Sequence, residues 1–299
     1  MMRKKIKLLD GSLSYPIEEK GYKLNTNLWT GEILIKNPEV IEDIHVDYIK
    51  SGSDYVTTSS YQLSVRRLRE EGYNISEIRR IFGQSVDLVK KAILKTGQNK
   101  IKIVGSFGPF ASYLSDGSEY IGFYELSDSE IKKFHQENSE IIHDLDIDII
   151  LYETIPCLRE VKIINDLIES YKKEVWISMT CNNDLNLRDS SSLEEACEIL
   201  SKSNQITTIG LNCFNPNLTK KAIKKLRKYS NKKILVYPNS GENFNSKFKT
   251  WFGEKKINNK EFSSWIDESP DIVGGCCRIG KNEIKKMKSF IENGVKKSI

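Results

Sequence analysis

Short apolar runs alternate along this chain with longer amphipathic segments. The apolar runs are rich in β-branched residues and have the length of buried strands; they predict strands at residues 6–11, 54–61, 101–108, 148–154, 175–181, 208–213, 233–241 and 271–277. The intervening segments carry apolar residues at helical spacing and predict helices at residues 37–45, 74–94, 127–145, 158–171, 192–201, 217–229, 260–266 and 283–294. Asn37 followed by Pro38 is a typical helix start, because an Asn side chain caps free N–H groups and proline suits the first helical position.

This alternation of strand and helix favours a parallel sheet, and eight repeats in 299 residues match the size of a (β/α)8 TIM barrel. A doubly wound open sheet is the alternative. Polar residues such as Asp10, Glu153 and Asn212 fall at the C-terminal ends of the predicted strands, which is the rim where barrels carry their active sites. We therefore predict a single α/β domain over residues 1–299 with its site at that rim.

The longest predicted connections follow the first and third strands. Residues 12–37 and 110–126 contain aromatic residues and glycines but few apolar positions at regular spacing. Long loops in compact domains are usually lids or binding loops. Trp29 and Tyr113 are therefore candidates to cover a substrate, and the alternative for each is a packing residue at the base of its loop.

The composition is that of a soluble globular enzyme, with 38% apolar and 29% charged residues. No stretch approaches the roughly 18 consecutive apolar residues of a membrane helix, and the first residues do not lead into a secretory signal. We therefore expect a cytoplasmic protein. The 46 basic residues face 41 acidic ones, and the lysines of residues 220–228 are spaced as on a solvated helix face, so we expect no nucleic-acid partner.

Three of the six cysteines fall at the ends of two predicted strands. Cys213 ends one strand, and Cys276 and Cys277 end another. Zn²⁺ takes thiolate ligands tetrahedrally, and three protein ligands leave a fourth position for an exchangeable group. Adjacent residues of a strand point to opposite faces, but Gly274 and Gly275 allow the backbone to bend so that both cysteines face one ion. The pattern indicates a catalytic zinc site.

Two other interpretations of the cysteines stay open. A buried cysteine often serves as a small core residue, and this is the expectation for Cys157, Cys181 and Cys197. A vicinal disulfide between Cys276 and Cys277 is the second alternative, which a reducing intracellular compartment disfavours.

An ordered set of motifs over nearly the whole chain resembles the zinc-dependent homocysteine S-methyltransferases, most closely the branch that uses S-methylmethionine as methyl donor. The motifs are Leu9-Asp-Gly-Ser12, Asn27-Leu-Trp29, Asn37-Pro38, Thr58-Ser-Ser-Tyr-Gln62, Gly105-Ser-Phe-Gly-Pro109, Asp116-Gly-Ser-Glu-Tyr120, Glu153-Thr154, Gly210-Leu-Asn-Cys213, Tyr237-Pro-Asn-Ser-Gly-Glu242, Thr250-Trp251 and Gly274-Gly-Cys-Cys-Arg278. One departure follows the last motif, where the family often has Thr-Thr-Pro and this chain has Ile279-Gly-Lys281.

The resemblance implies a zinc ion held by Cys213, Cys276 and Cys277, with the homocysteine sulfur entering as fourth ligand. Zinc coordination deprotonates a thiol at neutral pH and so creates the nucleophile. Asn239 matches a position that fills the fourth place in related barrels when homocysteine is absent, so it is included in the expected ligand set.

The resemblance also assigns residues to the amino-acid part of homocysteine. Asp10 and Glu153 are expected to accept hydrogen bonds from its ammonium group. Backbone amides around Gly11, Thr58 and Ser59 are expected to hold its carboxylate.

The implied methyl donor is the sulfonium cation S-methylmethionine, or S-adenosylmethionine. An aromatic face attracts such a cation by about 0.5–2 kcal/mol, and Trp29, Tyr61, Phe107 and Trp251 are expected near the rim. Betaine-using relatives carry a tyrosine where this chain has Thr154, which counts against betaine.

Two further alternatives concern the function as a whole. Because the chain ends soon after the eighth predicted strand, we expect it to lack the cobalamin and folate domains of the large methionine synthases, which disfavours a self-contained cobalamin enzyme and leaves a cobalamin-protein donor as an alternative. A non-catalytic zinc-binding barrel is the other, although it gives Asp10 and Glu153 no role. No long extension follows the eighth strand, and some betaine-using relatives oligomerise through such an extension, so we expect a monomer.

Overall fold

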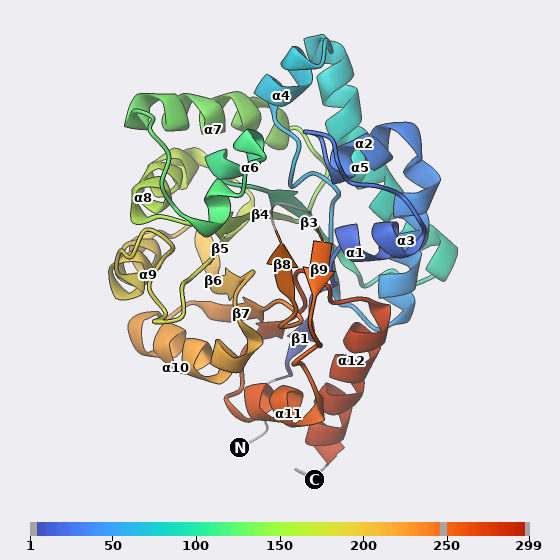
Figure 1. The fold of residues 1–299 in the computed structure, drawn as a ribbon, viewed down its shortest axis with the longest axis vertical. Helices are drawn as coiled ribbons and strands as arrows, with labels where there is room; N and C mark the ends of the chain where they lie inside the picture. Colours follow the sequence, from blue (N-terminus) through green and yellow to red (C-terminus); the bar gives the residue numbers. More distant parts are fainter. Residues whose placement is uncertain (1–4, 246–249, 297–299) are drawn as a thin grey trace.

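The computed structural model describes residues 5–245 and 250–296. Eight parallel strands form a nearly closed barrel with helices around it (Figure 1), in the order β1-β10-β7-β6-β5-β4-β3-β2. The strands are β1 Lys7–Leu8, β2 Tyr55–Thr57, β3 Lys102–Phe107, β4 Ile149–Ile155, β5 Glu174–Met179, β6 Ile206–Asn212, β7 Lys233–Tyr237 and β10 Ile272–Val273. A bridge between Leu9 and Tyr55 joins the first and last strands of this order. The predicted (β/α)8 barrel is confirmed, and the open doubly wound sheet is excluded.

Helices cover the outside of the barrel. They are α1 Ser14–Glu19, α2 Thr30–Lys36, α3 Pro38–Lys50, α4 Val65–Glu70, α5 Ile75–Thr96, α6 Phe110–Leu114, α7 Asp128–Ile142, α8 Leu158–Leu167, α9 Leu193–Lys202, α10 Thr219–Tyr229, α11 Asn259–Asp267 and α12 Lys281–Lys296. Short 3₁₀ helices are η1 Ser118–Tyr120, η2 Ile168–Ser170 and η3 Pro216–Leu218. Among the described residues, none of these helices combines the length and apolar composition needed to cross a bilayer.

Helix ends follow from local side-chain chemistry. Asn74 and Glu77 form a capping box at the start of α5, and Gly97 ends this helix in the left-handed conformation. Ser127 and Glu130 form the equivalent box at the start of α7. The starts of α5 and α7 therefore agree with their predicted positions within one residue.

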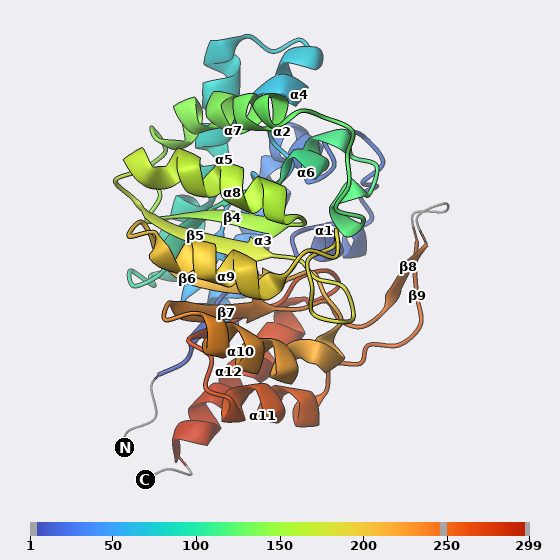
Figure 2. The same cartoon turned by 90° about the vertical axis from the view of Figure 1, so that its left-hand side faces the viewer.

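Two of the predicted loops contain helices. Residues 12–37 include α1 and α2, and residues 110–126 include α6 and η1. The sequence interpretation of these segments as irregular was wrong, because helices of three to seven residues are too short to show a clear helical period. Between β7 and α11 an antiparallel hairpin, β8 Asn243–Asn245 with β9 Thr250–Phe252, projects beyond the barrel (Figure 2) and was also not predicted.

Two apolar layers hold the barrel together. One lies between the sheet and the helices, and the second fills the barrel itself. The second layer consists of Leu9, Val104, Ile149, Leu151, Trp176, Leu235, Tyr237 and Ile272. Because alternate residues of a strand face the same side, Glu153 continues the inward series of Ile149 and Leu151 on β4. The carboxylate of Glu153 is therefore buried at the C-terminal end of the barrel, above the apolar layer that fills it.

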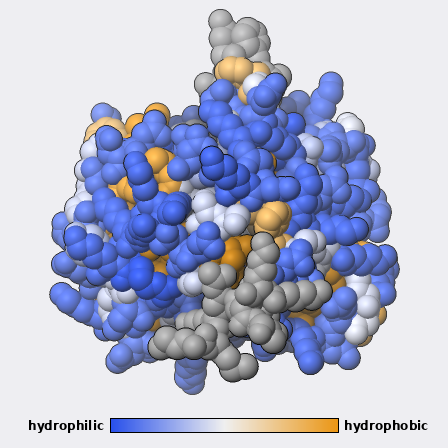
Figure 3. Space-filling view, turned by 90° about the horizontal axis from the view of Figure 1, so that it is seen from below, coloured by the Kyte–Doolittle hydropathy of each residue, from blue (hydrophilic) through white to orange (hydrophobic). Residues whose placement is uncertain are grey.

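The opposite, outer side of the helices is polar. Seen from below, the side of the molecule that carries α11 is coloured mostly hydrophilic outside the grey residues (Figure 3). On α10, Lys220 and Lys224 are half-exposed and both approach Glu268, at 3.5 and 3.4 Å. Lys220 and Lys224 thus lie on a solvated face of α10, as predicted, whereas Lys225 is partly buried and donates to the Leu185 carbonyl at 2.9 Å.

Candidate active site

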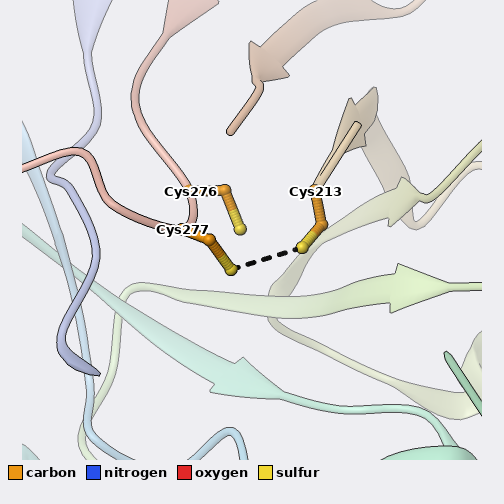
Figure 4. Close-up of side chains that lie close together, drawn as sticks. All are labelled: Cys213, Cys276 and Cys277. Atoms are coloured by element: carbon orange, nitrogen blue, oxygen red, sulfur yellow. Dashed lines mark hydrogen bonds between the residues drawn. The ribbon is translucent and has the colours of Figure 1, made fainter. Parts of the chain in front are cut away.

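The three predicted cysteine ligands meet at the C-terminal rim. Cys213 follows β6, Cys276 and Cys277 follow β10, and their side chains converge (Figure 4). The three sulfur atoms all lie within 4.8 Å of one another, and the sulfurs of Cys213 and Cys277 are 3.6 Å apart. Three soft donors at this separation fit the tetrahedral demand of a zinc ion and leave one position open.

Glycine makes the tight path of the β10 loop possible. A Cβ on Gly275 would lie 2.0 Å from a methyl carbon of Ile279, and a Cβ on Gly274 would lie 2.8 Å from Leu9. The loop is then fixed by its amides, since Cys276 N–H donates to the Pro238 carbonyl at 2.9 Å. Any larger residue at Gly275 would force Ile279 or this loop to shift, and one at Gly274 would press on Leu9 and the Asp10 carbonyl.

Asn239 follows β7 and contacts this loop. Its Oδ1 accepts a hydrogen bond from the backbone N–H of Cys277 at 3.1 Å. The contact gives Asn239 a role in orienting a cysteine, and its assignment as a fourth metal ligand stays a prediction.

Neighbouring donors favour an ionised thiol in the cluster. Hydrogen bonds from the thiols of Cys276 and Cys277 are the main cause that lowers the pKa of Cys213 well below its usual value. The hydroxyl of Tyr120 at 3.3 Å and the charge of Arg188 act in the same direction. A thiolate is the form that binds a metal ion.

Asp10 and Glu153 are both buried at the rim. Asp10 accepts hydrogen bonds from the backbone N–H of Thr57 at 2.9 Å and from its hydroxyl at 3.1 Å. Glu153 accepts from the hydroxyl of Ser106 and, at 3.0 Å, from that of Tyr237. Burial raises the pKa of Asp10 well above its usual value and that of Glu153 to about 7. Two buried carboxyl groups with raised pKa values are suited to receive a cation.

A reciprocal hydrogen-bond pair connects the carboxylate to the cysteines. The backbone N–H of Thr154 donates to Oδ1 of Asn212 at 2.9 Å, and Nδ2 of Asn212 donates to the Thr154 hydroxyl at 2.8 Å. These residues directly follow Glu153 and precede Cys213. Thr154 and Cys213 have φ values of 63° and 55°, a strained conformation that is found most often at functional sites.

One cavity of about 120 Å³, which opens to solvent, joins these groups. Its lining includes Asp10, Gly11, Trp29, Thr58, Ser59, Glu153, Cys213, Cys276 and Cys277. All the residues predicted to hold zinc or homocysteine, except Asn239, thus lie around a single space, whereas Phe107 and Trp251, predicted near the donor, are not among its lining residues.

One predicted contact needs correction. The backbone N–H of Thr58 already donates to the carbonyl of Val104 at 2.9 Å, so this amide is not available to a substrate carboxylate. The hydroxyl of Ser59 is buried and has no hydrogen-bond partner among the described residues, which makes it the better donor at this wall.

The two loop aromatics differ in their surroundings. Trp29, with a φ of 48°, lines the cavity. Tyr113 packs against Phe110, with ring centres 5.4 Å apart, and under Arg67 at 4.8 Å. Tyr113 is therefore the packing residue of the two.

Sequence reasoning gave no role to Glu119, Tyr120 or Tyr237, although all three line the cavity. Glu119 and Tyr120 lie about 90 positions before Cys213, on η1. The available signal was the motif Asp116-Gly-Ser-Glu-Tyr120, which carries an acidic and an aromatic residue in a predicted lid.

The family model described as homocysteine S-methyltransferase matches residues 7–291. The chain belongs to the homocysteine S-methyltransferase family. It is therefore an enzyme that transfers a methyl group to homocysteine and forms methionine.

Individual members of the homocysteine S-methyltransferase family are similar over most of their length. Homocysteine S-methyltransferase YbgG of Bacillus subtilis is 32% identical over 95% of this chain and 93% of its own, and homocysteine S-methyltransferase 1 of Arabidopsis thaliana is 33% identical over 91% and 89%. The metallated form of the homocysteine methyltransferase MmuM from Escherichia coli superposes with a TM-score of 0.85, 29% identity and 96% coverage of each chain. The predicted family is thus confirmed.

Proposed function

We propose that this homocysteine S-methyltransferase is zinc-dependent and takes its methyl group from S-methylmethionine, with S-adenosylmethionine as a second donor. The observation that carries the proposal is the convergence of three cysteine sulfurs within 4.8 Å in a cavity that also contains two buried carboxyl groups. The first set suits a thiophilic metal, and the second suits the ammonium group of an amino acid.

Cys213, Cys276 and Cys277 would hold the zinc ion. Bound zinc supplies the positive charge that keeps a homocysteine thiol deprotonated at neutral pH. The three residues come from two strand ends that the β6–β7 and β7–β10 pairings hold in register, so the protein fixes where the acceptor sulfur must sit.

Asp10 and Glu153 bind the ammonium group of homocysteine. Each carboxylate accepts hydrogen bonds from two donors of the protein, which fix the orientation of its side chain. The remaining lone pairs of each carboxylate are available to the ammonium group. An arriving cation favours the ionised form and lowers the raised pKa of Glu153. The hydroxyl of Ser59 and the amide of Gly11 are assigned to the substrate carboxylate.

The methyl transfer removes charge from the cavity. The bond between the methyl carbon and the sulfonium sulfur breaks, the electron pair stays on that sulfur, and the homocysteine sulfur forms the new bond. With S-methylmethionine both products are methionine. The aromatic rings of Trp29 and Tyr61 line the same cavity and attract the sulfonium before transfer.

The test is methionine formation by the purified protein with homocysteine and one donor at a time, namely S-methylmethionine, S-adenosylmethionine or betaine. Metal-free protein is compared with protein reloaded with one equivalent of Zn²⁺. We expect turnover with the two sulfonium donors, fastest with S-methylmethionine, and only after zinc is restored. Turnover with betaine alone, or equal turnover without metal, would overturn the proposal.

A further inference from the structure

Glu119 is a partly buried acidic residue in the cavity wall, and one of its oxygen atoms is unsatisfied. It lies on η1, between β3 and α7, and lines the same cavity as the cysteines. Its Oε2 is buried and has no hydrogen-bond partner among the described residues. Burial is the main cause that raises the pKa of Glu119 to about 7, and the charge of Cys213 adds to it.

A buried oxygen of this kind lowers the stability of the fold unless a hydrogen-bond donor or a cation lies next to it. A buried polar atom without a partner destabilises a fold, and more so if it is charged. The nearby cation Arg188 is engaged elsewhere, because it donates to the Thr180 hydroxyl at 3.2 Å and to the Cys213 carbonyl at 3.1 Å. The missing partner of Glu119 is thus best supplied by a ligand in the cavity.

The segment that carries Glu119 is held in place from both sides. Buried Glu160 on α8 accepts from the backbone N–H of Phe110 at 2.6 Å and from the hydroxyl of Tyr124, and it also contacts Nε2 of His135 at 2.6 Å. Between these two anchors, Asp116 accepts from the N–H of Ser118 at 2.9 Å. The carboxylate is therefore presented by a fixed loop.

The position of Glu119 relative to the cysteines identifies the group it faces. Glu119 lines the cavity together with Tyr61, and the hydroxyl of the next residue, Tyr120, lies 3.3 Å from Sγ of Cys213, which places this segment beside the acceptor sulfur. Asp10 and Glu153 instead lie at the ends of β1 and β4. For methyl transfer the donor sulfur must approach the acceptor sulfur, which places a sulfonium charge near Glu119.

We propose that Glu119 is the counter-charge for the sulfonium of the methyl donor and thereby selects positively charged donors. The inference rests on the proposed function, since it names the residue that recognises its donor. Because the sulfonium charge disappears during transfer, Glu119 stabilises the bound donor more than the transition state. It therefore contributes to donor binding and not to the chemical step.

This role predicts a specific kinetic pattern for Glu119→Gln, which keeps the size and removes the charge. We expect the KM for S-methylmethionine to rise about 10- to 100-fold, as for the loss of a close ion pair in a partly buried site. The kcat and the KM for homocysteine should not fall with it. Glu125→Gln is the matched control, because it removes the same charge from an exposed position of the same segment.

Two measurements distinguish the possible failures. The first uses 3-dimethylsulfoniopropionate, a sulfonium carboxylic acid without an ammonium group, as substrate or competitive inhibitor. Its affinity should fall in Glu119→Gln as that of S-methylmethionine does. An effect confined to S-methylmethionine would overturn the sulfonium assignment. Equal KM values in wild type and Glu119→Gln, with normal wild-type turnover, would refute this inference alone. If the wild type turned over no sulfonium donor, the proposed function would fail, and direct binding of S-methylmethionine to both proteins would still test Glu119.

Discussion

Replacement of Glu153 by Gln tests the acceptor site in two opposite ways. The substitution keeps the size of the side chain and removes its charge, while Ser106 and Tyr237 remain as neighbours. A hydrogen bond to a charged group contributes about 1.5–3 kcal/mol. We therefore expect homocysteine to bind about 10- to 100-fold more weakly to Glu153→Gln.

The same substitution should stabilise the substrate-free protein. Burial raises the pKa of Glu153 from 4.5 to about 7, so the folded protein binds a proton that the unfolded chain has lost. Wild type therefore loses stability as the pH rises from 4.5 to 7, and the shift corresponds to about 3 kcal/mol above pH 7. The glutamine variant does not titrate, and its advantage should grow over this window and be absent below pH 4.5.

Urea unfolding of both zinc-loaded proteins at several pH values between 4.5 and 8 measures the stability difference, and calorimetric titration with homocysteine measures binding. Glu125→Gln, at an exposed position, controls for the loss of one negative charge. A variant that binds homocysteine as tightly as wild type would remove the assigned role of Glu153. A stability difference that does not change with pH would refute the argument from burial.

Other substitutions test the metal loop and the core. Cys276→Ala should abolish zinc retention and methyl transfer together, measured by metal analysis and methionine formation; full activity without zinc would contradict the metal mechanism. Gly11→Ala would place a Cβ 2.6 Å from the Ile279 carbonyl and 2.8 Å from the Tyr48 hydroxyl, and should lower both the melting temperature and homocysteine affinity. Burial lowers the pKa of His45 from 6.5 to about 4, so the unfolded chain takes up a proton at this residue before the folded protein does. The free energy of unfolding of the wild type should therefore fall by about 2 kcal/mol between pH 7 and pH 5 through this residue. His45→Leu should lack this contribution, and identical pH profiles of the two proteins in urea unfolding would disprove it.

The parts of the site that could be predicted lie at strand ends. Asp10, Glu153 and Cys213 each follow an apolar run, and a parallel barrel brings the ends of all its strands to one rim. A one-dimensional pattern is then sufficient to infer proximity. The same reasoning located Cys276 and Cys277.

The remaining parts lie on segments whose course depends on tertiary packing. Glu119 reaches the cavity because Glu160 anchors both sides of its loop, and neither contact leaves a periodic signal in the sequence. The short helices α1 and α2 escaped prediction for a related reason, since their formation depends on packing more than on a sustained amphipathic pattern.

The anchoring of the β3–α7 loop has a consequence for how such enzymes diverge. The carboxylates and cysteines assigned to the acceptor are built into strand ends, whereas Glu119 is carried by a loop fastened to α7 and α8 through Glu160. Mutations in that loop can therefore alter which donor is accepted while the barrel and its thiol chemistry stay intact. If Glu119 selects the donor as proposed, acceptor recognition and donor choice rest on two parts of the chain that can change independently.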